Sequence, residues 1–244
     1  MGHNEKTAII IPARYGSTRL EGKPLLKVND KPIIQWVYEK AANVKSADCV
    51  IVATDDERIY NAVKSFGGQV EMTSTSHKCG TDRIKEVVDK YEDFEFIVNL
   101  QGDEPMIKVE NIELVIDGVK NYKADISTLI RPIDDENEIN NPNLVKCVID
   151  NQGYALYFSR SKIPFERKTN PAPFYGHVGI YGYTKNALTL MTNAEQTSLE
   201  IAESLEQLRA LQMGLRIKTA IVNDKPLGID TLQDFEEFKE LMTK

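Results

Sequence analysis

A short apolar run that ends at a proline is the feature that most restricts how this chain can fold. Residues 8–11 read Ala-Ile-Ile-Ile before Pro12, which is the length and branching of a strand buried in a parallel sheet. Apolar residues then recur at helical spacing over 33–42, and a second apolar run, 49–54, is again followed by a polar loop. This alternation predicts βαβ units, and therefore a parallel sheet covered by helices.

The same alternation continues along the chain. We expect further strands at 69–73, 94–100, 126–130, 145–150, 155–159, 178–183 and 217–222, and helices at 56–66, 82–91, 109–120, 199–213 and 231–242. The segment 145–160 reads as a hairpin, because Asn-Gln-Gly at 151–153 joins two β-rich runs. The sequence therefore predicts a mixed, mostly parallel α/β sheet flanked by helices, with an antiparallel excursion near 130–185. Since no repeat or long linker interrupts the chain, we expect one domain over 1–244.

Charge and cysteine content argue against several classes of protein. Lys plus Arg is 30 and Asp plus Glu is 37, so the net charge is −7, which disfavours a broad surface for nucleic acid. The three cysteines are far apart and form no C-x-x-C pair, which disfavours a disulfide framework or a zinc site and favours the cytoplasm. The apolar run near the N-terminus is too short for a signal peptide or a membrane span. We therefore expect a soluble cytoplasmic protein that binds neither nucleic acid nor membrane.

The loop after the first expected strand nearly matches a phosphate-binding P-loop. It reads GSTRLEGKP, but five residues separate its glycines, and Pro24 stands where the magnesium-binding hydroxyl of a P-loop should be. Arg14, Arg19 and Lys23 share ten residues with two glycines, which let the backbone approach a ligand closely. We predict that this loop binds phosphate; a solvated basic loop is the alternative.

Carboxylates after other strands could supply the metal ligands that this loop lacks, because ligands bind beyond the carboxyl ends of strands in such sheets. Asp103, in NLQGDEP, follows an apolar run and suits Mg²⁺, which prefers one or two carboxylates with phosphate oxygens and water; a simple turn is the alternative. Asp230, in GIDTLQD, by itself reads as the residue that opens the last helix. Asp55 and Asp56 read as caps of the helix that follows them.

A cationic loop combined with separate metal acids suits nucleotidyl transfer. In that reaction a nucleophile attacks the α-phosphate of a nucleoside triphosphate and pyrophosphate leaves, so that charge accumulates on phosphate oxygens. Positioned cations and Mg²⁺ are the expected catalysts, and no serine or cysteine nucleophile is required.

Eight motifs, in order, resemble one family over nearly the whole chain, from about Ile9 to about Asp234. They are IPARYGSTRLEGKPL, ATDD, TSTSHKCGTDR, NLQGDEP, GYALYFSRSKIP, GHVGIYGY, LEQLRAL and GIDT. The chain is similar to the 3-deoxy-manno-octulosonate cytidylyltransferases, also called CMP-Kdo synthetases. The resemblance implies a Rossmann-like nucleotidyltransferase fold and a homodimer in the bacterial cytoplasm. It also implies activation of 3-deoxy-D-manno-octulosonate (Kdo) with CTP and Mg²⁺, giving CMP-Kdo and pyrophosphate for lipopolysaccharide synthesis.

The resemblance also implies roles for individual residues. Arg14, Lys23 and Asp103 would be catalytic, and Asp103 and Asp230 would bind the metal, which replaces the cap interpretation of Asp230. The nucleotide-binding set would be Ala13, Arg14, Ser17, Lys23, Ser74, Gly80, Arg83, Gln101 and Asp103. The sugar-binding set would be Gln101, Arg160, His177, Tyr181, Glu206 and Gln207.

Plainer interpretations of some of these residues stay open. Apart from the resemblance, His177 reads as a strand residue with a hydrogen-bonded ring, and Glu206 and Gln207 read as part of a solvated helix face. Two positions depart from the family. Glu21 stands where the family usually has proline, which adds a negative charge near the phosphates, and Cys79 stands where it usually has serine, which puts a hydroxyl contact near the base in question.

Other functions compete with this one. A CMP-sialate synthetase shares the Ile-Pro-Ala-Arg opening but typically continues toward a Lys-Asn pair, whereas an amino-sugar relative of the Kdo enzymes is harder to exclude. A dinucleotide-dependent oxidoreductase would need G-x-G-x-x-G in its first turn, which this chain lacks. A nucleotide sensor would bind CTP without releasing pyrophosphate. The exact acid sugar and the number of Mg²⁺ ions stay open at this point.

Overall fold

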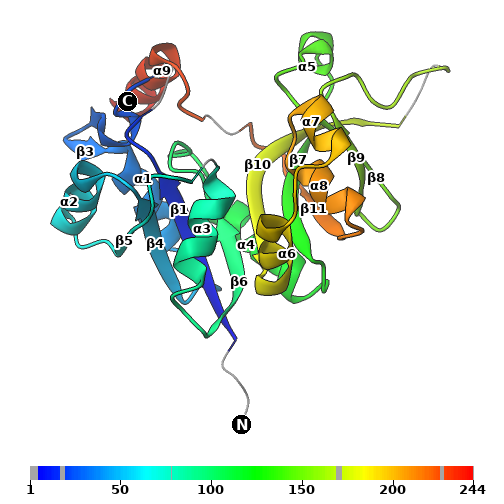
Figure 1. Ribbon diagram of the computed structural model, residues 1–244. Coiled ribbons are helices and arrows are strands. Elements are labelled where there is room, and N and C mark those ends of the chain that lie inside the picture. Colours follow the sequence, from blue (N-terminus) through cyan, green and yellow to red (C-terminus); the bar gives the residue numbers. More distant parts are fainter. Residues whose placement is uncertain (1–4, 17–19, 78, 169–171, 226–227, 244) are drawn as a thin grey trace. The chain divides into compact units, whose positions relative to one another are not determined.

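The computed structural model describes residues 5–16, 20–77, 79–168, 172–225 and 228–243 and divides into two compact units. Unit 1 comprises residues 1–113 and 226–244, and unit 2 comprises residues 114–225 (Figure 1). Each unit contributes its own group of strands and its own buried residues, and the prediction of one domain over 1–244 stays a prediction.

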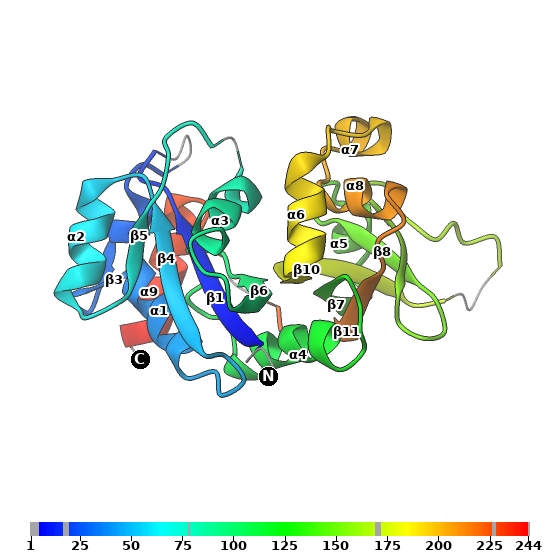
Figure 2. The ribbon, with the colours of Figure 1, turned by 60° about the horizontal axis from the view of Figure 1, so that its bottom comes forward.

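The sheet of unit 1 is built from parallel strands. They are β1 (Lys6–Ala13), β4 (Cys49–Thr54), β5 (Val70–Met72) and β6 (Phe94–Asn99), in the order β6-β1-β4-β5. Strand β1 pairs with β4 on one side and β6 on the other, and residues 8–11 are completely buried, as predicted for a central parallel strand (Figure 2). A small antiparallel hairpin consists of β2 (Lys27–Val28) and β3 (Lys31–Pro32).

Helices cover both faces of this sheet. They are α1 (Ile33–Ala42), α2 (Glu57–Ser65), α3 (Gly80–Val88) and α9 (Leu232–Thr243), with a 3-10 helix η1 (Lys23–Leu25) and with α4 (Val109–Lys120), within which the unit boundary falls. The chain steps from β1 through α1 to β4 and through α2 to β5, and then returns through α3 to β6 on the other side of β1. Because such crossovers are right-handed, α1 and α2 lie on one face of the sheet and α3 lies on the other.

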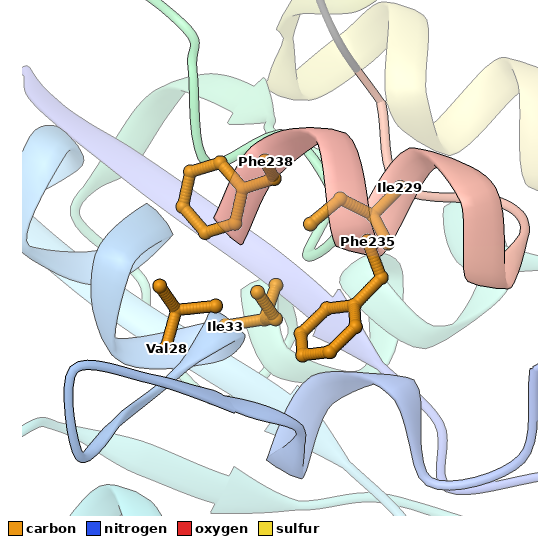
Figure 3. Packing of buried hydrophobic residues seen from close by; sticks show 5 residues of the cluster. All are labelled: Val28, Ile33, Ile229, Phe235 and Phe238. Atoms are coloured by element: carbon orange, nitrogen blue, oxygen red, sulfur yellow. The ribbon is translucent and has the colours of Figure 1, made fainter. Parts of the chain in front are cut away.

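The C-terminal helix packs against the first part of unit 1. Ile229, Phe235 and Phe238 form one buried cluster with Val28 and Ile33 (Figure 3). In this cluster, α9 and Ile229, which precedes it, pack against β2 and α1. It therefore fixes the segment that precedes α9, in which one predicted metal ligand lies.

The sheet of unit 2 is mostly antiparallel. Its strands are β7 (Ile126–Ile133), β8 (Lys146–Ile149), β9 (Ala155–Ser159), β10 (Phe174–Thr184) and β11 (Ile217–Ile221), in the order β11-β7-β10-β8-β9. Strands β11 and β7 run parallel, whereas β7-β10, β10-β8 and β8-β9 run antiparallel. The predicted hairpin is confirmed, and its turn contains Gly153 at φ +77°, a left-handed conformation that glycine adopts without strain. The mixed α/β class and the antiparallel excursion are also confirmed.

The helices of unit 2 correct one prediction. They are α5 (Glu136–Asn140), α6 (Lys185–Asn193), α7 (Ser198–Glu203) and α8 (Gln207–Gln212). A single helix over 199–213 is wrong, because Ser204 has a left-handed backbone (φ 52°) and separates α7 from α8. Apolar residues continue through 199–213 in the sequence, so helical periodicity alone does not distinguish one long helix from two short ones. Within the described part of the chain, no helix combines the length and apolarity needed to cross a membrane.

Candidate functional site

Lys23 and two carboxylates meet beyond the carboxyl ends of the unit 1 strands. Lys23 begins η1 after the glycine-bracketed loop, Asp103 follows β6, and Asp230 precedes α9. The Lys23 Nζ atom lies 2.6 Å from Asp103 Oδ2 and 3.2 Å from Asp230 Oδ1. Only 9% of Lys23 is exposed, so the ion pairs compensate a largely desolvated charge. The structure therefore brings together three residues that the sequence places far apart.

Backbone contacts also hold the two acids in place. The Ile229 N–H donates to the Asp103 carbonyl oxygen at 2.8 Å, which joins the segment after β6 to the segment before α9. A Cβ atom on Gly102 would lie 3.0 Å from the Pro12 carbonyl oxygen, so this turn lies directly against the end of β1. A larger residue at position 102 would push the Asp103 loop away from β1.

The N-terminus of α9 is capped without the Asp230 side chain. The Thr231 hydroxyl accepts from the Asp234 N–H at 3.2 Å, and the Asp234 carboxylate accepts from the N–H groups of Thr231 and Asp230 at 2.7 and 2.9 Å. This reciprocal arrangement is a capping box. The Asp230 carboxylate is therefore not needed as a cap and instead accepts a hydrogen bond from Lys23.

Glu104 is a buried carboxyl beside this cluster that the motifs did not single out. Burial, together with the charges of Asp103 and Asp230, raises the pKa of Glu104 to about 7, and Lys23 opposes this shift. Its Oε2 atom is buried and has no hydrogen-bond partner among the residues that the structure describes. The sequence shows only an acid next to Asp103, because which of two adjacent carboxylates turns inward is decided by tertiary packing.

The donor atoms of the cluster fit a magnesium-like cation. Asp103 and Asp230 converge on the Lys23 ammonium, and Mg²⁺ is commonly held by one or two carboxylates, with phosphate oxygens and water completing its coordination. Over the described ranges, no group of three or more His, Cys, Asp or Glu side chains is arranged to hold a metal ion. An ion bound here would therefore need phosphate or water oxygens as further ligands.

The end of β1 is joined to the loop before α3. Ala13 is the buried last residue of β1, and the Arg14 guanidinium donates to the carbonyl oxygens of His77 and, at 3.4 Å, Cys79. Gly80 begins α3 beside Pro12 of β1. Three residues of the predicted nucleotide set thus lie at the same place in the fold. Ser17, also predicted for this set, and its neighbour Arg19 lie outside the described residues.

Arg83 is fully buried and bonded to protein groups. Its guanidinium donates to Asp55 Oδ2 at 2.6 Å and to the Thr73 hydroxyl, and its Nε atom has no partner in the described part of the chain. The prediction that Asp55 caps α2 is therefore wrong, because its carboxylate pairs with Arg83. The prediction for Asp56 is confirmed, since its carboxylate accepts from the Arg58 N–H at 2.9 Å.

The remaining residues of the nucleotide set have local partners. The Ser74 N–H donates to Glu86 of α3 at 2.9 Å, and His77, which the motifs leave without a role, bonds to the same carboxylate. Glu86 therefore fixes the 74–77 loop against α3. The Gln101 amide donates to Asn99 Oδ1 at 2.9 Å within unit 1.

His177 lies on β10 in unit 2 between two aromatic rings. Its ring centre is 5.4 Å from that of Phe158 and 5.3 Å from that of Tyr181, and Nε2 is 2.9 Å from Thr128 Oγ1. The Thr128 hydroxyl donates to the Ile180 carbonyl oxygen at 2.7 Å, so it accepts from His177 Nε2–H. Burial lowers the pKa of His177 to about 4, and the neutral ring is left with Nδ1 as a hydrogen-bond acceptor.

The other predicted sugar residues of unit 2 gather around the same place. Burial raises the pKa of Tyr181, and the negative charge of Glu206 raises it further, so the phenol stays protonated. Glu206 is the N-cap of α8 and is followed by the buried Gln207. The structure therefore brings His177, Tyr181, Glu206 and Gln207 together, whereas Gln101, predicted for the same set, belongs to unit 1.

Arg160 is hydrogen-bonded to the main chain. Its guanidinium donates to the carbonyl oxygens of Glu203 at 2.7 Å, Pro142 at 3.0 Å and Ser204 at 3.4 Å. The fully buried Lys146 ammonium in turn donates to the Arg160 carbonyl oxygen at 2.6 Å. These contacts hold the turn that leads into α8, and a direct role for Arg160 in sugar binding stays a prediction.

Comparisons with known proteins agree with this arrangement. The chain matches a family model described as "Cytidylyltransferase" over residues 8–217. The 3-deoxy-manno-octulosonate cytidylyltransferase of Thermodesulfovibrio yellowstonii is 49% identical over 94% of this chain and 95% of its own. That of Photobacterium profundum is 47% identical over 96% of this chain and 98% of its own.

Solved structures extend the comparison to the fold. A structure described as CMP:2-keto-3-deoxy-manno-octonic acid synthetase complexed with CTP is 43% identical, with a TM-score of 0.94, and the match covers 98% of this chain and 99% of that chain. A 4-diphosphocytidyl-2C-methyl-D-erythritol synthase from Anaerococcus prevotii is 14% identical, with a TM-score of 0.66 over 99% of this chain and 100% of that chain. The second likeness concerns the fold alone and confirms the predicted nucleotidyltransferase fold.

Replacement of Cys79 by serine tests the cap of α3. Cys79 is the N-cap, and its Sγ atom accepts from the Asp82 N–H at 3.4 Å. Sulfur is a weak acceptor and serine is among the best N-caps, so Cys79→Ser should raise the free energy of unfolding by about 0.5–1 kcal/mol. Cys147→Ser is the control, because a hydroxyl at that fully buried position should lower it by about 1–3 kcal/mol. Urea unfolding measures both, and no gain for Cys79→Ser would contradict the capping role.

The pKa of His177 predicts how stability depends on pH. Its folded pKa of about 4 lies below the ordinary value of 6.5, so the unfolded chain binds the proton more tightly. The contribution of His177 to the free energy of unfolding is therefore complete above pH 6.5 and is lost as the pH falls toward about 4. We expect His177→Gln to lose less stability than the wild type between about pH 7 and about pH 5 in urea unfolding. Equal losses of stability in the wild type and in His177→Gln would mean that the pKa of His177 is not lowered by folding.

Proposed function

Because the chain belongs to the 3-deoxy-manno-octulosonate cytidylyltransferases, we propose that it activates Kdo with CTP, giving CMP-Kdo and pyrophosphate for lipopolysaccharide synthesis. The observation that carries the proposal is the cluster of Lys23, Asp103 and Asp230 beyond the carboxyl ends of the unit 1 strands. Nucleotides bind at that edge of such sheets, and this cluster supplies both a cation for phosphate and acids for a metal.

The reaction joins a sugar hydroxyl to the α-phosphate of CTP. The anomeric hydroxyl of Kdo attacks the α-phosphorus, the bond to the β-phosphate breaks, and the hydroxyl proton is released. Lys23 and Arg14 would neutralise the charge that develops on phosphate oxygens. Asp103 and Asp230 would hold Mg²⁺, which would neutralise the triphosphate and polarise its oxygens. In the structure described, the Lys23 ammonium holds both carboxylates close together.

The sugar would be bound by the unit 2 residues. Kdo carries many hydroxyls, which need both donors and acceptors. His177 Nδ1 and the Glu206 carboxylate would accept hydrogen bonds, whereas the protonated Tyr181 hydroxyl can also donate one. Gln207 can do both through its amide. The set is therefore suited to a polyhydroxylated ligand.

The base would be selected by the 73–83 segment. Arg83 donates to the Thr73 side chain, and the Ser74 N–H donates to Glu86, so the start of this segment is held in place, and hydrogen bonds from its main chain and from Ser74 could recognise a pyrimidine. A segment fixed in this way would not open to admit the larger purine. We therefore propose that CTP is the nucleotide used.

Location and assembly form part of the same proposal. The three cysteines are free, which suits the reducing cytoplasm. In the region 130–185, Leu156 is 61% exposed and Phe165 is 88% exposed, and apolar side chains of this size are commonly covered in a symmetric interface. We propose a homodimer that buries part of this region.

The assembly is tested by the mass of the protein in solution. Light scattering at micromolar concentration should give twice the chain mass of 27.6 kDa, and Phe165→Asp should lower the dimer fraction because it places a charge in an apolar contact. Asp placed at the exposed Leu241 of α9 is the control and should leave the mass unchanged. A wild-type protein that stays monomeric would contradict the proposal.

Pyrophosphate release tests the function. With Kdo and Mg²⁺ present, turnover with CTP should exceed turnover with ATP at least about 100-fold, because the fixed base segment leaves a purine excluded or unpaired. UTP is the closer competitor, since its base carries a carbonyl acceptor where that of CTP carries an amino donor. Equal turnover with ATP would contradict the role of the 73–83 segment. Binding of CTP without pyrophosphate release for any acid sugar would instead indicate a sensor, and faster release with the 8-amino analogue would indicate the amino-sugar relative.

Exchange of the two acids for amides tests the metal site. Asp103→Asn and Asp230→Asn should each lower Mg²⁺-dependent turnover by about 10²–10³, and the double variant should be little worse than the poorer single variant, because both serve one unit. Asp234→Asn is the matched control, since Asp234 only caps α9: it should lose about 1 kcal/mol of stability and keep its turnover. A fully active Asp230→Asn enzyme would remove Asp230 from the metal site.

A further inference from the structure

A stacked arginine at the base of the phosphate loop has no part in the reaction steps above. The Arg58 guanidinium carbon lies 3.2 Å from the centre of the Tyr15 ring. Tyr15 follows β1 at the start of the loop, and Arg58 lies in the first turn of α2. This cation–π contact therefore joins the helix after β4 to the loop after β1.

Asp56 fixes the direction of the guanidinium. Its carboxylate accepts from Arg58 Nε at 2.9 Å and from a terminal nitrogen at 2.6 Å, which is a bidentate pair. The same carboxylate caps α2 by accepting from the Arg58 N–H. The hydrogen bond to Asp56, and then the charge of that carboxylate, raise the pKa of Arg58. Because one carboxylate both caps the helix and orients the guanidinium, Arg58 is held over Tyr15 by rigid structure.

Tyr15 also contacts the far end of the loop. The Gly22 N–H donates to the Tyr15 carbonyl oxygen at 2.9 Å, so the two ends of the loop are joined. A Cβ atom on Gly22 would lie 3.0 Å from Tyr15 Cζ, and the backbone there has φ +66°. Both the close ring contact and the left-handed conformation favour glycine at this position.

The position of Gly22 sets the position of Lys23. Gly22 is the N-cap of η1, and its carbonyl oxygen accepts from the Leu25 N–H at 2.8 Å. The Leu26 N–H then donates to the Lys23 carbonyl oxygen at 3.1 Å. A continuous set of short contacts therefore runs from Asp56 through Arg58, Tyr15 and Gly22 to Lys23.

We propose that Asp56, Arg58 and Tyr15 form a clamp that holds Tyr15 against Gly22 and so positions Lys23 for the triphosphate. The identity of the triphosphate rests on the proposed function, whereas the clamp itself rests on the contacts above. Its three members are positioning residues that act through Gly22. When Gly22 and Lys23 are held in place beforehand, they lose less conformational freedom on binding phosphate. The clamp therefore raises the affinity for the triphosphate without touching it.

Paired substitutions test the clamp. Arg58→Gln removes the stacked cation and keeps the backbone N–H that Asp56 caps, and Tyr15→Leu removes the ring, whereas Tyr15→Phe keeps it. The matched control is Arg216→Gln, because Arg216 stacks on the Tyr154 ring at 3.9 Å and both residues belong to unit 2. Thermal unfolding establishes that each variant is folded.

Two readouts are compared for every variant. The first is amide hydrogen exchange over residues 20–26, which includes the Gly22 N–H bonded to Tyr15. The second is the dissociation constant of CTP by calorimetry, with kcat and KM for CTP measured alongside. Arg58→Gln and Tyr15→Leu should exchange faster and bind CTP about three- to tenfold more weakly, with a smaller change in kcat. Tyr15→Phe and Arg216→Gln should resemble the wild type in both readouts.

Other outcomes would overturn the clamp. Unchanged exchange and unchanged affinity in Arg58→Gln and Tyr15→Leu would show that the stack is incidental. Weaker CTP binding with unchanged exchange would show that Arg58 touches the nucleotide itself. If the wild type binds no CTP, the proposed function fails, and the exchange rates still decide whether the clamp exists.

Discussion

The ion pairs of one largely buried ammonium connect three distant parts of unit 1. Removing an ammonium from water without a polar partner would cost several kcal/mol, and for Lys23 the partners in the folded chain are two acids. Asp103 is supplied by the turn after β6, and Asp230 by the segment before α9. The backbone bond from Ile229 to Asp103 and the packing of α9 beside α1 hold these segments where the charge requires them. The return of the chain to unit 1 after residue 225 is therefore part of the site as well as of the core.

The parallel part of the fold could be predicted because its signals are local. The run at residues 8–11 is buried on both faces, and a strand of this kind is apolar at every position rather than at alternate ones. Since ligands bind where such strands end, Lys23 and Asp103 could be proposed from their places after apolar runs. Asp230 could not, because an acid before a helix usually caps it. Only the family resemblance predicts that Asp230 binds a metal, and the cap is made by Thr231 and Asp234 instead.

What the sequence did not predict depends on partners that are distant in the chain. Asp55 and Asp56 are adjacent and alike, and their different roles follow from Arg83, whose buried guanidinium takes one carboxylate and leaves the other to cap α2. The break at Ser204 has no apolar signature, because apolar residues continue in the sequence on both sides of the left-handed residue. Glu104 turns inward beside Asp103 for reasons of packing alone. Local patterns identify elements and their ends, and tertiary contacts decide which polar side chain is used.

The polar residues around Lys23 in unit 1 and around His177 in unit 2 differ in what compensates for their burial. In unit 1 the largely buried Lys23 ammonium is paired with two carboxylates within hydrogen-bonding distance, and such charged groups suit a triphosphate and a metal ion. In unit 2 the His177 ring lies between the rings of Phe158 and Tyr181. Burial there lowers the pKa of His177 and raises that of Tyr181, so both rings favour their neutral forms. Neutral donors and acceptors are what a polyhydroxylated sugar needs. Desolvation acts on both groups of residues, and the difference lies in their partners, since carboxylates lie beside Lys23 and aromatic rings lie beside His177.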